Sequence, residues 1–252
     1  MANLVAIDPQ AHKNLTINPA LAEIHGAALN LIPTVLAEFP HLAVQYPIVL
    51  AKNGDTGEFI FSALLGFEPH ENLFWQQEQW QGLYLPLQLQ RQPFFVGDVV
   101  DEKTNGDYVV CLDMDSPSIN QASSTNASAG DDININSQSL FTETGEDSPY
   151  FQQAKNCLAQ LLQGEIDNKN LLNALNKFDL LQPLSVEITF INKQSTRLNG
   201  LYTINQDKLA ALPAEHITEL HQQHLLPAIY TMSTSLGQLY ALIERKNACL
   251  SA

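Results

Sequence analysis

Five polar residues between positions 38 and 91 have side chains that could carry out chemistry: Glu38, Tyr46, Glu71, Asn72 and Arg91. The carboxylates and the phenol could exchange protons with a substrate, and the guanidinium could bind an anionic group. Arg91 lies next to a proline-fixed backbone, so it could instead pair with Glu38 or Glu71 and stack on an aromatic ring. Of these two roles for Arg91, the sequence favours the structural ion pair.

The same stretch also contains both tryptophans and many other aromatic residues, which could form a binding surface. Aromatic rings and Arg supply most hot spots of protein interfaces. Phe74 and Trp75 are consecutive in a segment that we expect to be extended, so their side chains point to opposite faces and cannot both enter one core. The candidate binding residues are Phe67, Phe74, Trp75, Trp80, Tyr84 and Arg91.

Sequence signatures of known catalytic and cofactor sites are missing. The chain has no Gly-x-Gly-x-x-Gly, no Gly-Lys-Ser/Thr and no His-Glu-x-x-His. His221 and His224 are three residues apart on a predicted helix, but Glu219 points elsewhere, so this pair is a weak candidate metal site. Cys111 has no neighbour that would lower its pKa, which favours a buried strand residue over a nucleophile. We therefore predict no cofactor and no metal.

Several short motifs follow one another in a fixed order. They are Glu38-Phe39, Tyr46-Pro-Ile-Val49, Ala63-Leu-Leu-Gly66, Glu71-Asn-Leu-Phe74, Tyr84-x-Pro86 and Arg91-x-Pro-Phe94. This order resembles the SapC family of bacterial proteins, and the resemblance continues over nearly the whole chain. The later matching residues are Cys111-Leu-Asp113, Leu140-Phe141, Gly145-Glu146, Gly200-Leu-Tyr202, Leu209 and Ser235-Leu236.

Three features depart from the family pattern: Leu50 replaces an aromatic residue, His224 replaces a glycine, and residues 115–138 form an enlarged loop. The resemblance implies association with surface-layer protein secretion loci in some bacteria. In others it implies neighbourhoods of tryptophan halogenase-like proteins and TonB-dependent receptors. It implies no defined biochemical activity.

Charge and length narrow the class of protein. The 252 residues are 45% hydrophobic, enough for a sizeable core, and 12 basic against 27 acidic residues give a net charge of −15. This charge would repel nucleic acid and anionic lipid, and it suits a basic partner. The alternative is that the acidity keeps the protein soluble or reflects a salty habitat.

The sequence predicts a cytoplasmic protein that does not span a membrane. Its three cysteines are widely separated, as is typical of reduced thiols, and the N-terminal residues do not resemble a secretory signal. The most apolar segment, residues 31–51, contains three prolines and Glu38, whereas a spanning helix needs about 20 predominantly apolar residues. The oligomeric state stays open.

Local patterns predict a strand-rich first half and a helical second half. Expected strands cover 46–50, 59–67, 80–86, 94–100, 108–112, 184–191 and 197–204, with a hairpin turn at 53–57. Expected helices cover 34–44, a segment from Pro149 to Gly164, 169–178, 208–212, 214–223 and 225–246. Residues 115–139 are poor in large apolar side chains, which indicates a mobile surface loop.

We therefore predict an α+β fold. An N-terminal antiparallel β-rich half, built as a sheet or a partly open barrel, packs with a helical C-terminal half. We expect one domain over residues 1–252, in which 115–138 is a mobile surface insertion. The predicted function is a non-catalytic accessory protein that binds a peptide or protein partner. The alternative is a peptide-modifying or oxygenase-type enzyme whose site is built from Glu38, Tyr46, Glu71 and Arg91.

Overall fold

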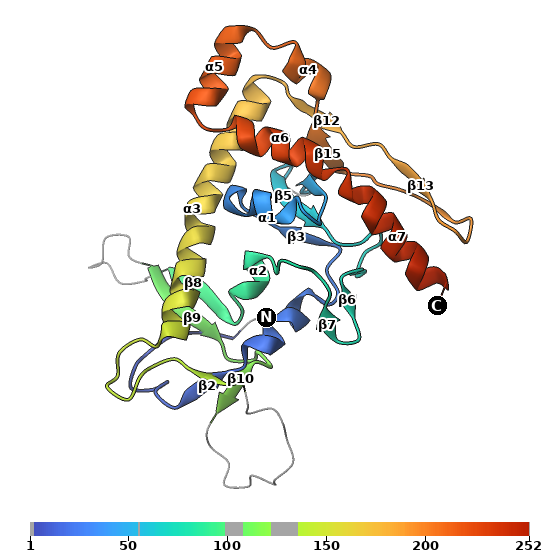
Figure 1. The fold of residues 1–252 in the computed structure, drawn as a ribbon. Coiled ribbons are helices and arrows are strands. Elements are labelled where there is room, and N and C mark those ends of the chain that lie inside the picture. The colour runs from blue at the N-terminus through green and yellow to red at the C-terminus, as the bar shows by residue number, and fades with distance from the viewer. Residues whose placement is uncertain (1–2, 55, 99–107, 122–135, 252) are drawn as a thin grey trace. The chain divides into compact units, whose positions relative to one another are not determined.

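The computed structural model describes residues 3–54, 56–98, 108–121 and 136–251, drawn as a coloured ribbon in Figure 1. Contacts along the chain group into two compact units, and each is made of two separate segments. Unit 1 consists of Met1–His25 and Leu87–Leu161, and unit 2 consists of Gly26–Pro86 and Leu162–Ala252. The prediction of a single cooperative domain stays a prediction.

Unit 1 contains two small antiparallel sheets. One sheet has the order β1 (Leu4–Ala6), β9 (Tyr108–Asp113), β8 (Phe94–Asp98), and the other has the order β10 (Ile119–Gln121), β2 (Leu15–Ile17), β11 (Gln138–Ser139). The β8–β9 pair, in which Phe94 lies opposite Leu112, confirms the two strands expected there. A short helix, α2 (Leu87–Gln90), precedes β8.

The ends of the expected loop at 115–138 are strands. Both β10 and β11 pair with β2, and Ile119 lies opposite Ile17. The prediction of an irregular loop was wrong for these ends, because backbone pairing with β2 offsets their lack of large side chains. Residues 122–135 lie outside the described residues.

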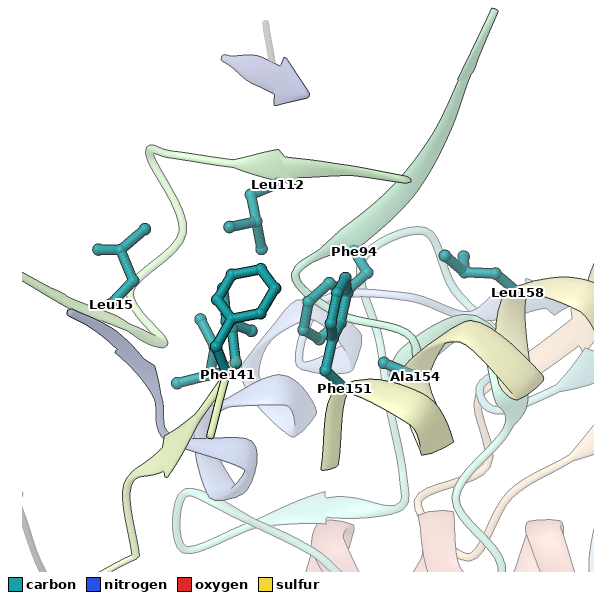
Figure 2. Close-up of a cluster of buried hydrophobic side chains, with 9 residues drawn as sticks. Leu15, Phe94, Leu112, Phe141, Phe151, Ala154 and Leu158 are labelled. Atoms are coloured by element: carbon teal, nitrogen blue, oxygen red, sulfur yellow. The ribbon is translucent and has the colours of Figure 1, made fainter. Parts of the chain in front are cut away.

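The core of unit 1 is a cluster of buried side chains from β2, β8, β9 and the start of α3 (Pro149–Lys177), shown in Figure 2. Phe151 packs between Phe94 and Phe141, with ring centroids 5.7 Å apart in both pairs. The helix begins as predicted: Pro149 is its first residue, and the hydroxyl of Ser148 accepts a hydrogen bond from Phe151 N at 3.1 Å.

Unit 2 is built on a five-stranded antiparallel sheet. Its order is β12 (Leu181–Pro183), β15 (Leu201–Ile204), β4 (Ile48–Lys52), β5 (Phe59–Leu64), β3 (Leu31–Pro33). The β4–β5 hairpin is confirmed, and its turn uses Gly57 at a φ of 72°. Because β15 pairs with β4, the late strands join a sheet begun by the early ones, and a two-stranded hairpin alone would be only marginally stable.

Two-stranded hairpins and helices complete unit 2. The hairpins are β6 (Trp75–Gln76) with β7 (Gln79–Trp80), and β13 (Glu187–Thr189) with β14 (Ser195–Arg197). The helices are η2 (Leu36–Glu38), α1 (Phe39–Leu42), α4 (Gln206–Ala210), α5 (Ala214–Gln222), α6 (Leu226–Ser235) and α7 (Gln238–Ser251). A 3₁₀ helix, η1 (Pro19–Gly26), crosses the boundary between the two segments. The sequence predicted strands at 184–191 and 197–204. In the structure, β13 pairs with β14, and residues 201–204 join the large sheet as β15.

One helix replaces the two that were expected between residues 149 and 178. Glycine lowers helix stability by about 1 kcal/mol relative to alanine, which made Gly164 look like an end. Instead α3 continues through Gly164. The residue is glycine because a Cβ at this position would lie 2.4 Å from the Cβ of Val35. Gly164 therefore allows a close approach of two segments.

The architecture confirms the predicted α+β class. Antiparallel sheets dominate the N-terminal half and helices the C-terminal half, and the strands of the described residues close into no barrel. Within the described ranges, none of the helices combines the length and the apolarity that crossing a bilayer requires.

Candidate functional site

The two tryptophans lie opposite each other on the β6–β7 hairpin, so both stand on one face of it. The hairpin turns at Gln77 and Glu78, which have φ values of 51° and 60°. Two consecutive left-handed residues make the turn type that usually requires Asn or Gly, so this turn holds local strain. Trp80 is anchored inward, because its Nε1 donates a hydrogen bond to the hydroxyl of Tyr46 at 3.2 Å.

Tyr46 is the centre of an aromatic cluster beneath that hairpin. It is fully buried, and its hydroxyl donates to the carbonyl oxygen of Tyr84 at 2.7 Å. Its ring centroid lies 4.6 Å from that of Phe74, which is also buried and stacks on Trp80. A Cβ at Gly82 would lie 2.0 Å from the Tyr46 hydroxyl, so this glycine leaves room for the hydrogen bonds.

Glu38 connects to this cluster through Tyr84. Its carboxylate is buried and accepts hydrogen bonds from the Thr34 hydroxyl at 2.9 Å and from Val35 N at 3.2 Å. Its other oxygen accepts the hydroxyl of Tyr84 at 3.2 Å. Glu38 thus caps the start of η2, because its carboxylate accepts from the backbone N–H of the cap residue Val35, which is the glutamate half of a capping box.

An exposed, largely apolar surface adjoins the cluster, and three of its members, His41, Val44 and Leu83, were not predicted from the sequence. Leu83 is 85% exposed, and its backbone N–H donates to Oε1 of Gln45 at 2.6 Å, next to Val44, which is 63% exposed. The ring of Tyr84 stacks on His41 with centroids 5.2 Å apart. We call the set His41, Val44, Leu83 and Tyr84 the Leu83 surface, and we count with it the half-buried Trp75 of β6 as a predicted binding residue. Of the other predicted binding residues, Phe67 and Phe74 are buried.

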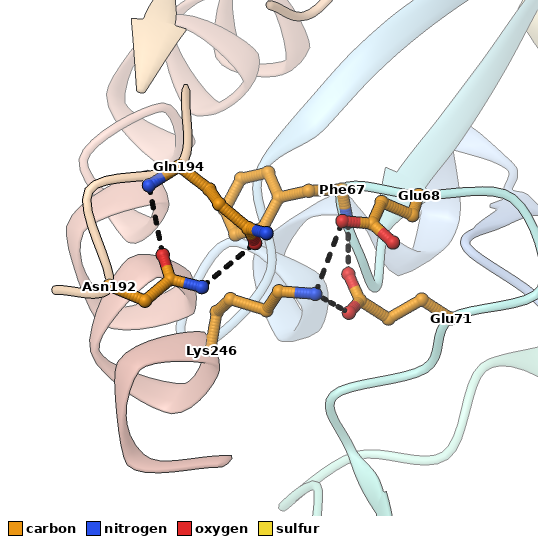
Figure 3. Close-up of polar contacts among 6 residues, drawn as sticks. All are labelled: Phe67, Glu68, Glu71, Asn192, Gln194 and Lys246. Atoms are coloured by element: carbon orange, nitrogen blue, oxygen red, sulfur yellow. Dashed lines mark hydrogen bonds and ion pairs between the residues drawn. The ribbon is translucent and has the colours of Figure 1, made fainter. Parts of the chain in front are cut away.

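Glu71 has a structural partner of its own. Figure 3 shows Lys246 of α7 reaching its carboxylate and that of Glu68, and the Lys246 side chain is only 11% exposed. The second oxygen of Glu71 accepts Phe67 N at 2.8 Å. Burial lowers the pKa of Lys246, but the hydrogen bond and charge of Glu71 outweigh this and leave that pKa raised. The carboxylate is thereby neutralised within unit 2.

Asn72, the remaining polar candidate beside Glu71, is also engaged in the fold. Its side-chain amide donates to the carbonyl oxygen of Gly26 at 2.7 Å, and its oxygen accepts Phe74 N at 2.8 Å. Both ends of the carboxamide are therefore used to hold the backbone before β6.

Arg91 belongs to unit 1, whereas Glu38 and Glu71 belong to unit 2. Its guanidinium donates to Gln88 Oε1 at 2.7 Å and to the Phe94 carbonyl at 2.9 Å, and it stacks 4.1 Å above the Phe95 ring. Burial lowers the pKa of this guanidinium. The predicted ring contact is confirmed. The ion pair with Glu38 or Glu71 would join the two units and stays a prediction.

The candidate metal ligands His221 and His224 and the thiol of Cys111 lie in the part of the chain that the structure describes. There, no group of three or more His, Cys, Asp and Glu side chains could hold a metal ion. His221 and His224 are both exposed, and His224 has a φ of 58° just after α5. A left-handed residue explains why glycine would suit this position. Cys111 lies buried on β9, and burial raises the pKa of its thiol.

These features define an α+β protein with discontinuous units and an aromatic cluster under an exposed apolar surface. The SapC family model matches residues 7–242, nearly the whole chain, and the protein belongs to the SapC family. No curated protein and no solved structure matches the chain.

The buried phenol of Tyr46 makes stability depend on alkaline pH. Burial raises its pKa to about 12 from the ordinary value of 10.0. Between these two pH values the unfolded chain loses a proton that the folded chain keeps. The stabilisation is complete below pH 10 and falls by about 2 kcal/mol as the pH rises to 12.

We expect Tyr46→Phe to lower the free energy of unfolding by about 1–3 kcal/mol near pH 8, because Trp80 and the Tyr84 carbonyl lose a partner. Above pH 10 this difference from wild type shrinks, since phenylalanine does not ionise. Urea unfolding at pH 8 and pH 11.5 measures both effects. A difference that stays constant with pH would contradict the raised pKa.

Proposed function

We propose that this protein is a non-catalytic accessory protein that binds a peptide or protein partner through the Leu83 surface. The observation that carries the proposal is the 85% exposure of Leu83, whose backbone N–H is held by a hydrogen bond to Gln45. Covering an exposed apolar side chain with a partner lowers the free energy of the complex. If the side chain is already held in place, little conformational entropy is lost on binding. Trp75 and Tyr84 add the aromatic area that interface hot spots use.

The net charge of −15 supports a partner with basic groups around its apolar contact. Three free thiols, Cys111, Cys157 and Cys249, support the cytoplasm as the compartment. The SapC resemblance supports a partner from surface-layer secretion loci or from halogenase and TonB-receptor neighbourhoods. Within such loci the protein would hold another protein or a segment of it.

Two observations weigh against the enzyme alternative built from Glu38, Tyr46, Glu71 and Arg91. Tyr46 is fully buried and its raised pKa keeps the phenol neutral, so it does not serve as a proton acceptor at neutral pH. Glu71 is neutralised by Lys246. Glu38 remains the member of this set with a hydroxyl partner, Tyr84, that could relay a proton.

A site-specific photo-crosslinker tests the proposal inside the bacterium that makes the protein. With the crosslinking residue at position 83, we expect one recurrent protein adduct, and the same residue at position 166 serves as the control. Ile166 is 55% exposed on α3 and lies apart from the Leu83 surface in sequence. Excess wild-type chain should suppress the adduct in extracts.

The matched variants are Leu83→Ala, Trp75→Ala and Ile166→Ala. The first two should weaken binding of the captured partner by about 2 kcal/mol, roughly 30-fold in Kd, while melting temperatures fall by no more than about 2–4 °C. Ile166→Ala should bind normally. If Leu83→Ala and Trp75→Ala both keep full stability and full affinity for every captured protein, the binding proposal is wrong and the enzyme alternative moves ahead.

A further inference from the structure

A polar groove lies in unit 2 between helix α3 and the C-terminal end of α5, and it shares no lining residue with the Leu83 surface. Its volume is about 700 Å³, which is within the range of sites that hold small ligands. The floor is apolar and is formed by Leu36, Ala174 and Leu225. None of the candidate catalytic residues lines it.

One wall is a stripe of polar side chains along α3. Asp167, Asn170, Asn173 and Lys177 follow one another at intervals of three or four residues, so they share one face of the helix. Asn170 and Asn173 are exposed. Each carboxamide presents two donors and an acceptor, which matches the N–H and C=O groups of a peptide backbone.

The opposite wall comes from α5 and the residues that end it. Glu219 accepts hydrogen bonds from Lys177 and, at 3.3 Å, from the side-chain amide of Gln223. His224 then turns the chain in a left-handed conformation, and Leu225 N caps the helix on the Leu220 carbonyl at 3.0 Å. This wall therefore includes the C-terminus of α5, where the helix dipole gives partial negative charge.

The lining excludes several classes of ligand. No Trp, Tyr or Phe lies among the described lining residues, so the groove lacks the stacking platform that sugars and bases use. Lys177, the one Lys or Arg among the described lining residues, is paired with Glu219, which disfavours a phosphate ligand. The remaining charge is negative, because Asp167 and the C-terminal end of α5 both favour a cation.

Asp167 is available for such a cation. Its Oδ1 accepts the side-chain amide of Gln163 at 3.1 Å, and its Oδ2 has no hydrogen-bond partner within the described chain. We propose that this groove binds a short extended peptide segment, whose backbone pairs with the carboxamides of Asn170, Asn173 and Gln223 and whose Lys or Arg side chain pairs with Asp167. This site is separate from the Leu83 surface and does not depend on the function proposed for it.

Three fluorescein-labelled libraries of random octapeptides, with a fixed central Arg, Ala or Glu, test the inference on the full chain. Fluorescence anisotropy gives affinities, and ¹⁵N NMR follows the side-chain amides of Asn170, Asn173 and Gln223. We expect saturable binding in the order Arg, Ala, Glu, with shifts in these amide signals. The double variant Asn170→Ala/Asn173→Ala should weaken binding of the Arg library at least about tenfold.

Asp167→Asn should remove the preference for Arg over Glu while keeping the amide shifts. Asn176→Ala is the matched control, since Asn176 is exposed on the same helix and does not line the groove. Trp75→Ala should leave peptide binding unchanged, which separates this site from the Leu83 surface. The inference is overturned by amide signals that do not shift, by a preference for Glu, or by groove variants that bind as well as Asn176→Ala does.

Discussion

Glu38→Ala should lower the free energy of unfolding by about 3–5 kcal/mol, because two buried donors and one half-buried donor lose their acceptor at once. They are the Thr34 hydroxyl, Val35 N and the Tyr84 hydroxyl. The truncation also leaves a cavity at the start of η2. Urea unfolding followed by tryptophan fluorescence measures the loss.

Glu38→Gln is the control for charge, because its carbonyl oxygen can still accept from Thr34 and Val35. We expect it to lose less than half as much stability as the alanine variant. If Glu38→Ala unfolds at the wild-type urea concentration, the carboxylate is not a structural cap. A functional role for Glu38 would then become the stronger interpretation.

Phe74→Ala should cost about 3–5 kcal/mol, the usual cost of removing a buried phenylalanine from a packed core. The Phe74 ring contacts Tyr46 and Trp80, and the guanidinium of Arg245 lies 4.4 Å from its centroid. Its neighbour Trp75 is only half-buried. Trp75→Ala should therefore cost about 1 kcal/mol, mainly from the cross-strand pair.

Thermal unfolding of both variants, recorded side by side, tests this division. The two residues are adjacent in sequence, so the comparison controls for position in the chain. Equal losses would mean that the buried Phe74 ring contributes no more to stability than the half-buried Trp75 ring. A loss of partner binding in Phe74→Ala alone would point to unfolding of the surface and not to a direct contact.

The sequence was sufficient to predict the elements whose patterns are local. The β4–β5 hairpin was predicted from apolar runs on either side of turn residues, the strands β8 and β9 were predicted on either side of a polar loop, and Pro149 marked the start of α3. Gly164 misled the prediction because the close approach of Val35, 129 residues earlier, is invisible locally. The role of a glycine depends on what packs against it.

The candidate site was predicted in composition but not in arrangement. Phe74 is buried and Trp75 is half-buried, so the two neighbours differ in burial, while the binding role predicted for Trp75 stays a prediction. The ion pair of Glu71 with Lys246 could not be foreseen, because it joins residues 175 positions apart and any of several cations could have served. Leu83 was missed because an exposed leucine has no sequence signal of its own.

The pairing of β15 with β4 sets a condition on how the protein is made. Strand β4 ends at Lys52 and its neighbour begins at Leu201, so about 150 residues must be synthesised between them. At translation rates of about 5–20 residues per second, β4 waits roughly 7–30 s with an unpaired edge. Its side chains Ile48, Val49 and Leu50 are fully buried in the finished protein.

During that interval the nascent chain presents an apolar strand edge of the kind that aggregates. A chaperone that binds nascent chains at the ribosome should therefore increase the yield of folded protein. The increase should be larger than for a protein whose domains are each continuous in sequence. Release of the chain before Ile204 would leave the sheet without β15. Truncated products should consequently be insoluble.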